Sequence, residues 1–297
     1  YRFFTTDRRR FIVADCPGHE QYTRNMATGA STADLAVILV DAEKGLSPQT
    51  RRHAAIVQLF GVRHVLLAVN KMDLVERSAE RFAELSKGFA DIARALGIQQ
   101  LTAIPLVARS GENVTARSPA MPWYDGPTLL EALETAGLDG ASAADSPFRM
   151  AVQWVNRPHA AFRGFAGQIA SGRVAPGDRI RILPSGREAQ VQRVVTADGD
   201  LAHAIAGQSV TLTLDREEDV SRGDLLCAAS APAVVADRIE ATLVWMDDPE
   251  LLPGRPYLLK MGTRTTGAIV TDIRHRIEIE TLRPQPAKTL ALNDLAV

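Results

Sequence analysis

Two short segments of the 297-residue chain contain side chains that could bind and read a nucleotide. The first is Asp15-Cys16-Pro17-Gly18-His19, which lies between an apolar run at residues 11–14 and a segment with helical spacing. An acid at the end of a strand, then a glycine turn and a helix start, suits phosphate and metal chemistry. Gly18 would let the backbone approach a phosphate, Pro17 fixes φ, and His19 could lie beside an attacking water. An ordinary turn has the same pattern, so this segment alone leaves both interpretations open.

The second segment, Asn70-Lys71-Met72-Asp73, directly follows a predicted strand at residues 64–69. The carboxylate of Asp73 can accept hydrogen bonds from both N1–H and N2–H of guanine. Adenine has an acceptor at N1 and no 2-amino group, so a buried acid here would reject it. Asn70 could bridge the base and a neighbouring loop, and the stem of Lys71 could cover the ring face. A polar loop closing a strand is the alternative, but the two segments together indicate a guanine-nucleotide site.

The elements that would position these segments alternate between strands and helices. Residues 1–6 and 10–15 predict a hairpin, and the apolar run at residues 35–40 predicts a strand buried on both faces. Further strands are predicted at residues 64–69 and 101–107, and helices at residues 48–60, 79–96 and 128–136. Such alternation predicts an α/β domain at residues 1–140 with a doubly wound, mostly parallel sheet.

The pattern changes after this domain. Residues 141–147 are small and polar and predict a linker, and short β-like runs separated by turn residues follow. We therefore expect a β-barrel at residues 148–231 and a second, incomplete β-barrel at residues 232–297. The fold class is thus α/β plus all-β.

Composition restricts the possible partners and compartment. The net charge of −1 gives no general electrostatic case for binding nucleic acid or an acidic membrane, and no apolar run reaches the length of a membrane span. The two cysteines, Cys16 and Cys227, are too few for a disulfide or metal framework, which favours a reduced, cytoplasmic setting. The chain starts with Tyr1, inside a predicted strand, and ends after few barrel strands, so we expect a fragment that is truncated at both ends.

The motifs resemble those of a known family. Asp-x-x-Gly followed by Asn-Lys-x-Asp in alternating β/α order resembles the translation-factor class of P-loop GTPases, and residues 167–178 with a following barrel resemble elongation-factor-Tu-like proteins. More narrowly, residues 19–31 (HEQYTRNMATGAS), 49–53 (QTRRH) and 122–131 (PWYDGPTLLE) resemble the GTPase large subunit of bacterial sulfate adenylyltransferase.

The resemblance implies roles for individual residues. Asp15 would hold Mg²⁺ through a water, Pro17 and Gly18 would adjoin the γ-phosphate, with the Gly18 amide contacting it, and His19 would position the attacking water. The guanine base would be read by four residues, Asn70, Lys71, Asp73 and, through its backbone amide, Ala108. The family usually has serine at the position of Val107, so a hydroxyl that would brace this loop is missing here.

The resemblance also implies the reaction and the partner. A small catalytic subunit would carry out the chemistry of ATP and sulfate, forming adenosine 5′-phosphosulfate and pyrophosphate, while this chain would use GTP and Mg²⁺. The alternatives are a translation elongation factor that delivers aminoacyl-tRNA and a GTPase-derived scaffold without turnover. Neither a nucleic acid nor a membrane is expected as a partner of the sulfate-activating subunit.

One expected motif is missing from the sequence. No Gly-x-x-x-x-Gly-Lys-[Ser/Thr] segment, which would cradle the phosphates, occurs in the 297 residues. We therefore expect this polypeptide by itself to bind GTP weakly and to hydrolyse it negligibly.

Overall fold

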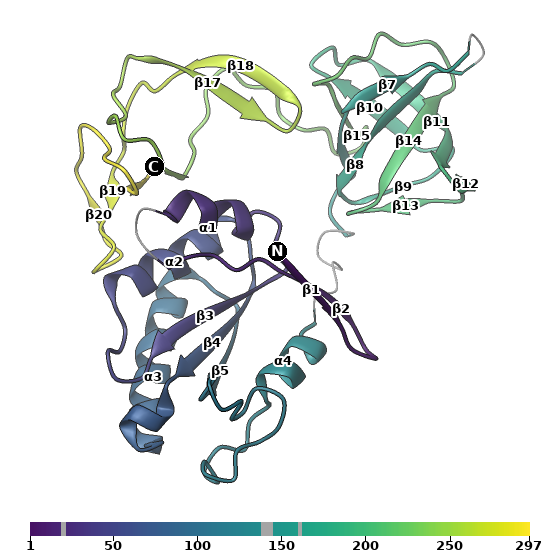
Figure 1. The fold of residues 1–297 in the computed structure, drawn as a ribbon. Coiled ribbons are helices and arrows are strands. Elements are labelled where there is room, and N and C mark those ends of the chain that lie inside the picture. Colours follow the sequence, from purple (N-terminus) through teal and green to yellow (C-terminus); the bar gives the residue numbers. More distant parts are fainter. Residues whose placement is uncertain (19–21, 138–144, 160–161) are drawn as a thin grey trace. The chain divides into compact units, whose positions relative to one another are not determined.

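The computed structural model describes residues 1–18, 22–137, 145–159 and 162–297 (Figure 1). The chain forms two compact units. The first comprises Tyr1–Leu138, Glu240–Pro253 and Thr271–Val297, and the second comprises Asp139–Ile239 and Gly254–Val270. His19, the predicted water-positioning residue, lies outside the described residues.

The amino-terminal part of the first unit has the predicted alternation of strands and helices. Its elements are β1 (Arg2–Thr5), β2 (Arg10–Val13), α1 (Thr23–Ala30), β3 (Leu35–Asp41), α2 (Pro48–Leu59), β4 (His64–Asn70), a 3₁₀ turn (Met72–Val75), α3 (Ala79–Leu96), β5 (Gln100–Pro105) and α4 (Leu129–Thr135). β1 and β2 form the predicted hairpin, and β3, β4 and β5 form a parallel sheet in that order. The α/β fold class is therefore confirmed.

Side chains of β4 point alternately to the two faces of this sheet, and both faces are covered. Val65, Leu67 and Val69 are buried in a core that also contains residues of α1, α2 and α3. Leu66 and Ala68 face the opposite way and pack in a core with α4. A strand covered on both faces needs a continuous apolar sequence, which explains why the run at β4 contains no alternation.

Local signals set the helix boundaries. The hydroxyl of Ser47 accepts a hydrogen bond from the Thr50 backbone at 3.1 Å, and Pro48 occupies the first turn of α2, where its missing N–H costs nothing. Ser78 caps α3 in the same way, and α3 ends at Gly97, whose φ of 73° is easily reached only by a residue without Cβ. These boundaries place the loops that follow β3 and β4 at the carboxyl edge of the sheet.

The prediction that β3 is buried on both faces is wrong for one residue. Leu39 is 62% exposed, whereas Val40 beside it is buried. The core around α4 extends to Leu35 and Val37 but does not include Leu39. The second face of β3 is therefore open towards its carboxyl end.

The second unit contains the predicted β-barrel. Its strands are β6 (Arg149–Ala151), β7 (Trp154–Asn156), β8 (Gly164–Ser171), β9 (Arg173–Val174), β10 (Arg179–Leu183), β11 (Glu188–Thr196), β12 (Gly199–Leu201), β13 (Ala204–Ile205), β14 (Ser209–Leu214) and β15 (Leu225–Ala228). Neighbours pair in the order β10, β15, β6, β8, β14 and β11, and pairing between β10 and β11 closes the ring. Inward-facing side chains such as Met150, Ile169 and Leu212 are fully buried and fill its interior.

The carboxyl-terminal segment contains short antiparallel strands. β17 (Pro256–Met261) and β18 (Arg264–Ile269) form a hairpin. β16 (Leu243–Val244), β19 (Arg276–Ile277), β20 (Pro284–Gln285) and β21 (Leu295–Ala296) form a separate sheet in the order β16, β21, β19 and β20. The exact domain boundaries at residues 140, 147 and 231 stay predictions. Within the described ranges, no helix has the length and apolar character that crossing a membrane would require.

A pair of glycines tests the packing of the barrel. Gly172 and Gly186 have nearly the same left-handed φ, 75° and 77°, but a Cβ on Gly172 would lie 2.4 Å from the backbone N of Phe148, whereas a Cβ on Gly186 would meet nothing within 4 Å. Gly186→Ala should therefore cost only the left-handed strain, about 1–2 kcal/mol. Gly172→Ala adds overpacking against backbone and should cost about 2–5 kcal/mol. Urea-dependent hydrogen exchange of barrel amides measures both, and equal losses would contradict this packing.

Candidate nucleotide-binding site

The carboxyl ends of β3, β4 and β5 meet at one edge of the sheet and bring the predicted base-reading residues together. Asp41 pairs with Asn70 in the register of β3 and β4. The backbone N–H of Ala42 donates to the Asn70 carbonyl at 2.8 Å, and that of Met72 donates to the Leu106 carbonyl at 3.1 Å. Backbone hydrogen bonds thus continue beyond the strands and hold the loops after β3, β4 and β5 next to one another.

Asn70 joins two of these loops through its side chain. Its Oδ1 accepts a hydrogen bond from the backbone N–H of Ala108 at 3.0 Å. The geometry therefore contains the contact of Asn70 with the neighbouring loop, and its contact with the base stays a prediction. The Ala108 amide is the group expected to contact the base. A nucleotide would therefore have to share this N–H with the Asn70 side chain or displace that side chain from it.

Lys71 is held by a residue that sequence reasoning missed. Its Nζ donates to Oδ2 of Asp41 at 2.7 Å, and its backbone has a left-handed φ of 62°. Asp41 also accepts hydrogen bonds from the backbone N–H groups of Glu43 and Lys44. The hydrogen bond from Lys71 lowers the pKa of Asp41, and the same bond raises the pKa of Lys71. An acid that ends a buried parallel strand was the available sequence signal for Asp41.

Asp73 lies in the 3₁₀ turn after β4 and is exposed. The expectation of a buried carboxylate is therefore wrong. The pKa of Lys71 is raised mainly by its hydrogen bond to Asp41, and that of Arg77 mainly by its hydrogen bond to Glu112. The negative charge of Asp73 adds to both, so two cations lie near it. A bound base would itself have to exclude water from Asp73 before the carboxylate could discriminate strongly.

Asp15, Pro17 and Gly18 form an exposed segment after β2. A Cβ built on Gly18 would lie 3.9 Å from Cε1 of His53, so His53 on α2 is the described side chain closest to this position. Burial lowers the pKa of His53, and its Nε2 lies 3.0 Å from Nε2 of Gln49. His53 has no ligand spacing in the sequence, and only the fold places it beside Gly18.

The two motifs remain separate within the residues for which the structure gives a placement. No hydrogen bond or ion pair among them links Asp15–Gly18 to the loop at residues 70–73, and no group of three or more potential metal ligands gathers. The exposed carboxylate of Asp15 offers oxygen atoms of the kind that a hard cation prefers. The assignment of Mg²⁺ to Asp15 through a water stays a prediction, as do the roles of Pro17 and Gly18.

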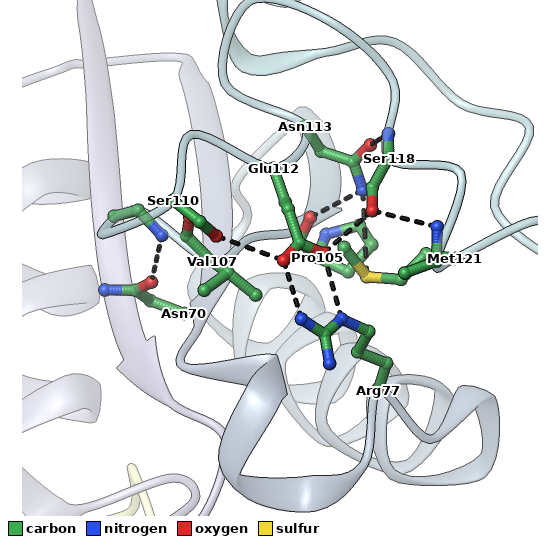
Figure 2. Close-up of polar contacts among 11 residues, drawn as sticks. Asn70, Arg77, Pro105, Val107, Ser110, Glu112, Asn113, Ser118 and Met121 are labelled. Carbon is green, nitrogen blue, oxygen red and sulfur yellow. Dashed lines mark hydrogen bonds and ion pairs between the residues drawn. The ribbon is translucent and has the colours of Figure 1, made fainter.

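A second polar cluster braces the loop that carries Ala108 (Figure 2). Both carboxylate oxygens of Glu112 accept hydrogen bonds from Arg77, at 2.9 Å from Nε and 2.7 Å from a terminal nitrogen. The hydroxyls of Ser110 and Ser118 donate to the same carboxylate at 3.0 Å and 2.7 Å. Buried Asn113 completes the cluster, because its Nδ2 donates to the Pro105 carbonyl at 2.9 Å. None of these residues belongs to a recognised motif, and sequence reasoning missed them.

Comparisons with known proteins agree with this geometry. Residues 2–137 match the family model described as elongation factor Tu GTP binding domain, and residues 238–297 match GTP-eEF1A C-terminal domain-like. Sulfate adenylyltransferase subunit 1 of Laribacter hongkongensis is 50% identical over 297 residues, which is 100% of this chain and 62% of that protein. The bifunctional enzyme NodQ of Azospirillum brasilense is 54% identical over 293 residues, covering 99% of this chain and 47% of the relative.

The chain is a homologue of sulfate adenylyltransferase subunit 1. The match extends over the whole chain, which spans about half to two thirds of the length of these curated relatives. In this subunit 1 homologue, Val107 is buried at the start of the loop that carries Ala108. Hydroxyls nearby, on Ser110 and Ser118, donate to Glu112.

The acid stability of the subunit 1 homologue should depend on Glu112. Its pKa is lowered from 4.5 to about 2, chiefly by the hydrogen bonds from Arg77; burial opposes this, and the hydroxyls of Ser118 and Ser110 add to it. Because the folded-state pKa lies below the unfolded one, the stabilisation is complete above about pH 4.5 and is lost as the pH falls towards about 2.

Glu112→Gln should lower the free energy of unfolding at pH 7 by about 1–2 kcal/mol, since both partners are partly exposed. It should also flatten the decline in stability between pH 4.5 and pH 2. Asp91→Asn is the matched control, because it removes the exposed Arg94–Asp91 pair and should change stability by no more than about 0.5 kcal/mol. Urea-dependent hydrogen exchange of β4 and β5 amides reads out both. If the free energy of unfolding falls equally between pH 4.5 and pH 2 in Glu112→Gln and in the unsubstituted protein, the decline does not depend on Glu112.

Proposed function

We propose that this chain is the guanine-nucleotide-binding part of the GTPase subunit of a sulfate adenylyltransferase. The observation that carries the proposal is the hydrogen bond between Asn70 and the Ala108 amide, which joins the two loops predicted to read guanine. The homology to sulfate adenylyltransferase subunit 1 supports the same assignment. The site lies at the carboxyl edge of a parallel sheet, where open α/β sheets bind ligands.

Each residue has a defined task in this proposal. Asp73 accepts N1–H and N2–H of guanine, while Lys71 covers the ring with its stem and is oriented by Asp41. Asn70 fixes the loop whose Ala108 amide faces the base. These contacts distinguish guanine from adenine because adenine would leave the Asp73 carboxylate without donors.

In the protein expressed from its complete gene, the phosphate side of the site would take part in hydrolysis. Asp15 would hold Mg²⁺ through a water, and the cation would supply positive charge that stabilises the transferred phosphoryl group. Pro17 shapes the turn, and the Gly18 amide contacts the γ-phosphate. His19 orients the water that attacks the γ-phosphorus, which yields GDP and phosphate. Loss of the γ-phosphate changes the loop at residues 15–19, and this change is transmitted to the partner.

The partner is a small catalytic subunit that binds ATP and sulfate. Its reaction forms adenosine 5′-phosphosulfate and pyrophosphate, the activation step of sulfate assimilation. Formation of this mixed anhydride is uphill, so coupling to GTP hydrolysis in this subunit supplies the missing driving force. The paucity of cysteines agrees with a cytoplasmic location.

An exchange of base specificity tests the nucleotide assignment. In the protein expressed from its complete gene, Asp73→Asn should weaken GDP binding at least about tenfold, the cost of an unmatched polar contact. The same variant should strengthen binding of xanthosine diphosphate, because an amide can donate to the 2-oxo group and accept from N1–H. Competition against a fluorescent nucleotide measures both affinities. Asp91→Asn is the control, and equal weakening of both nucleotides by Asp73→Asn would show that Asp73 does not read the base.

Copurification with candidate partners tests the second half of the proposal. The protein from the complete gene should form a complex with the small sulfate adenylyltransferase subunit of its own organism. That complex should produce adenosine 5′-phosphosulfate faster with GTP than with GDP. With the Asp73→Asn variant, xanthosine triphosphate rather than GTP should increase the rate of adenosine 5′-phosphosulfate production. Binding of aminoacyl-tRNA without any association with the small subunit would instead support a translation elongation factor, whose GTP-binding domain gives the family match.

A further inference from the structure

We infer that the Arg77–Glu112 ion pair sets the spacing between the two loops that read guanine and so acts as a positioning pair for base specificity. This inference rests on the proposed function. Arg77 follows the 3₁₀ turn that carries Asp73, and Glu112 closes the loop that carries Ala108 (Figure 2). The bidentate contact between the two side chains therefore spans the gap between the loops, independently of Asn70.

Each end of the pair is tied by backbone hydrogen bonds to the residue that precedes a proposed base-reading residue. The N–H of Arg77 donates to the carbonyl of Met72, the residue before Asp73, at 2.8 Å. On the other side, Val107 and Glu112 exchange two backbone hydrogen bonds, of 3.3 Å and 3.2 Å. A shift of the ion pair must consequently move Asp73 relative to Ala108.

The turn that carries Arg77 depends on such an anchor. Glu76 and Arg77 both have left-handed φ values, 53° and 54°, which residues with a Cβ seldom adopt. Such conformations persist only when the surroundings hold them. Trp123 contributes through Nε1, which donates to the Arg77 carbonyl at 3.0 Å. The turn is therefore held by its backbone carbonyl as well as by the guanidinium.

The chemistry of the pair suits a fixed spacer. Two parallel N–H···O bonds between a guanidinium and a carboxylate define both distance and orientation, which a single contact does not. The hydroxyls of Ser110 and Ser118 occupy the remaining acceptor positions on Glu112, so the carboxylate cannot easily turn away.

The test compares GDP with inosine diphosphate, which lacks only the 2-amino group. The ratio of their dissociation constants reports how well Asp73 engages that group, whereas general loosening of the fold weakens both nucleotides alike. In the protein expressed from its complete gene, Glu112→Gln should reduce the preference for GDP at least about fivefold. Ser118→Ala, a milder variant that removes one hydrogen bond to Glu112, should reduce it about twofold. Asp91→Asn should leave it unchanged.

The outcomes separate this inference from the proposed function. An unsubstituted protein with no preference for GDP over inosine diphosphate would overturn both. A clear preference that survives in Glu112→Gln and Ser118→Ala would overturn only the positioning role, even if both variants unfold more readily. If Glu112→Gln fails to fold, Ser118→Ala decides the question by the same ratio.

Discussion

The candidate site depends on the register of three parallel strands. β4 lies between β3 and β5, is buried on both faces, and aligns Asp41, Asn70 and the end of β5 at one edge of the sheet. Sliding β4 by a single residue would exchange the side chains that fill the two different cores on its faces, so close packing on both faces favours this alignment. The loops inherit their proximity from the core, and hydrogen bonds between Ala42 and Asn70 and between Met72 and Leu106 extend it beyond the strands.

Charge organises what the core leaves exposed. Lys71 and Arg77 lie on either side of the 3₁₀ turn that carries Asp73. Lys71 pairs with Asp41 at the end of β3, and Arg77 pairs with Glu112 in the loop after β5. Exposed ion pairs generally contribute little to stability, and the Lys71–Asp41 pair, in which the lysine side chain is largely exposed, is best understood as orienting a side chain. The Arg77–Glu112 pair is more enclosed on the side of its cation, since the Arg77 side chain is 32% exposed against 52% for Lys71, and the two oxygens of Glu112 accept four hydrogen bonds.

The parts that sequence reasoning recovered are those with a local or periodic signal. The buried strand at β4 is a continuous apolar run, and α3 carries both a serine cap and a terminal glycine, so each could be recognised without tertiary information. The loop at residues 70–73 carries a motif whose chemistry can be derived from guanine. Glu112 and His53 carry no such signal. Their partners, Arg77 at a separation of 35 residues and the backbone at Gly18, become neighbours only through the packing of α2, α3 and β5.

The exposure of Asp73 changes how the specificity of the site must be explained. A carboxylate that was already buried would reject adenine at a fixed cost, but an exposed one keeps its water until a base displaces it. In the proposed function, discrimination would arise only when guanine covers Asp73 while the Ala108 amide contacts the same base. Such simultaneous contact is favoured when the two loops are correctly spaced before the nucleotide binds. Loops that had to become ordered on binding would lower the affinity, because that ordering costs conformational entropy. In the proposed function, the groups that connect these loops, Asn70 on one side and the Arg77–Glu112 pair on the other, would therefore be as important to base recognition as the carboxylate of Asp73.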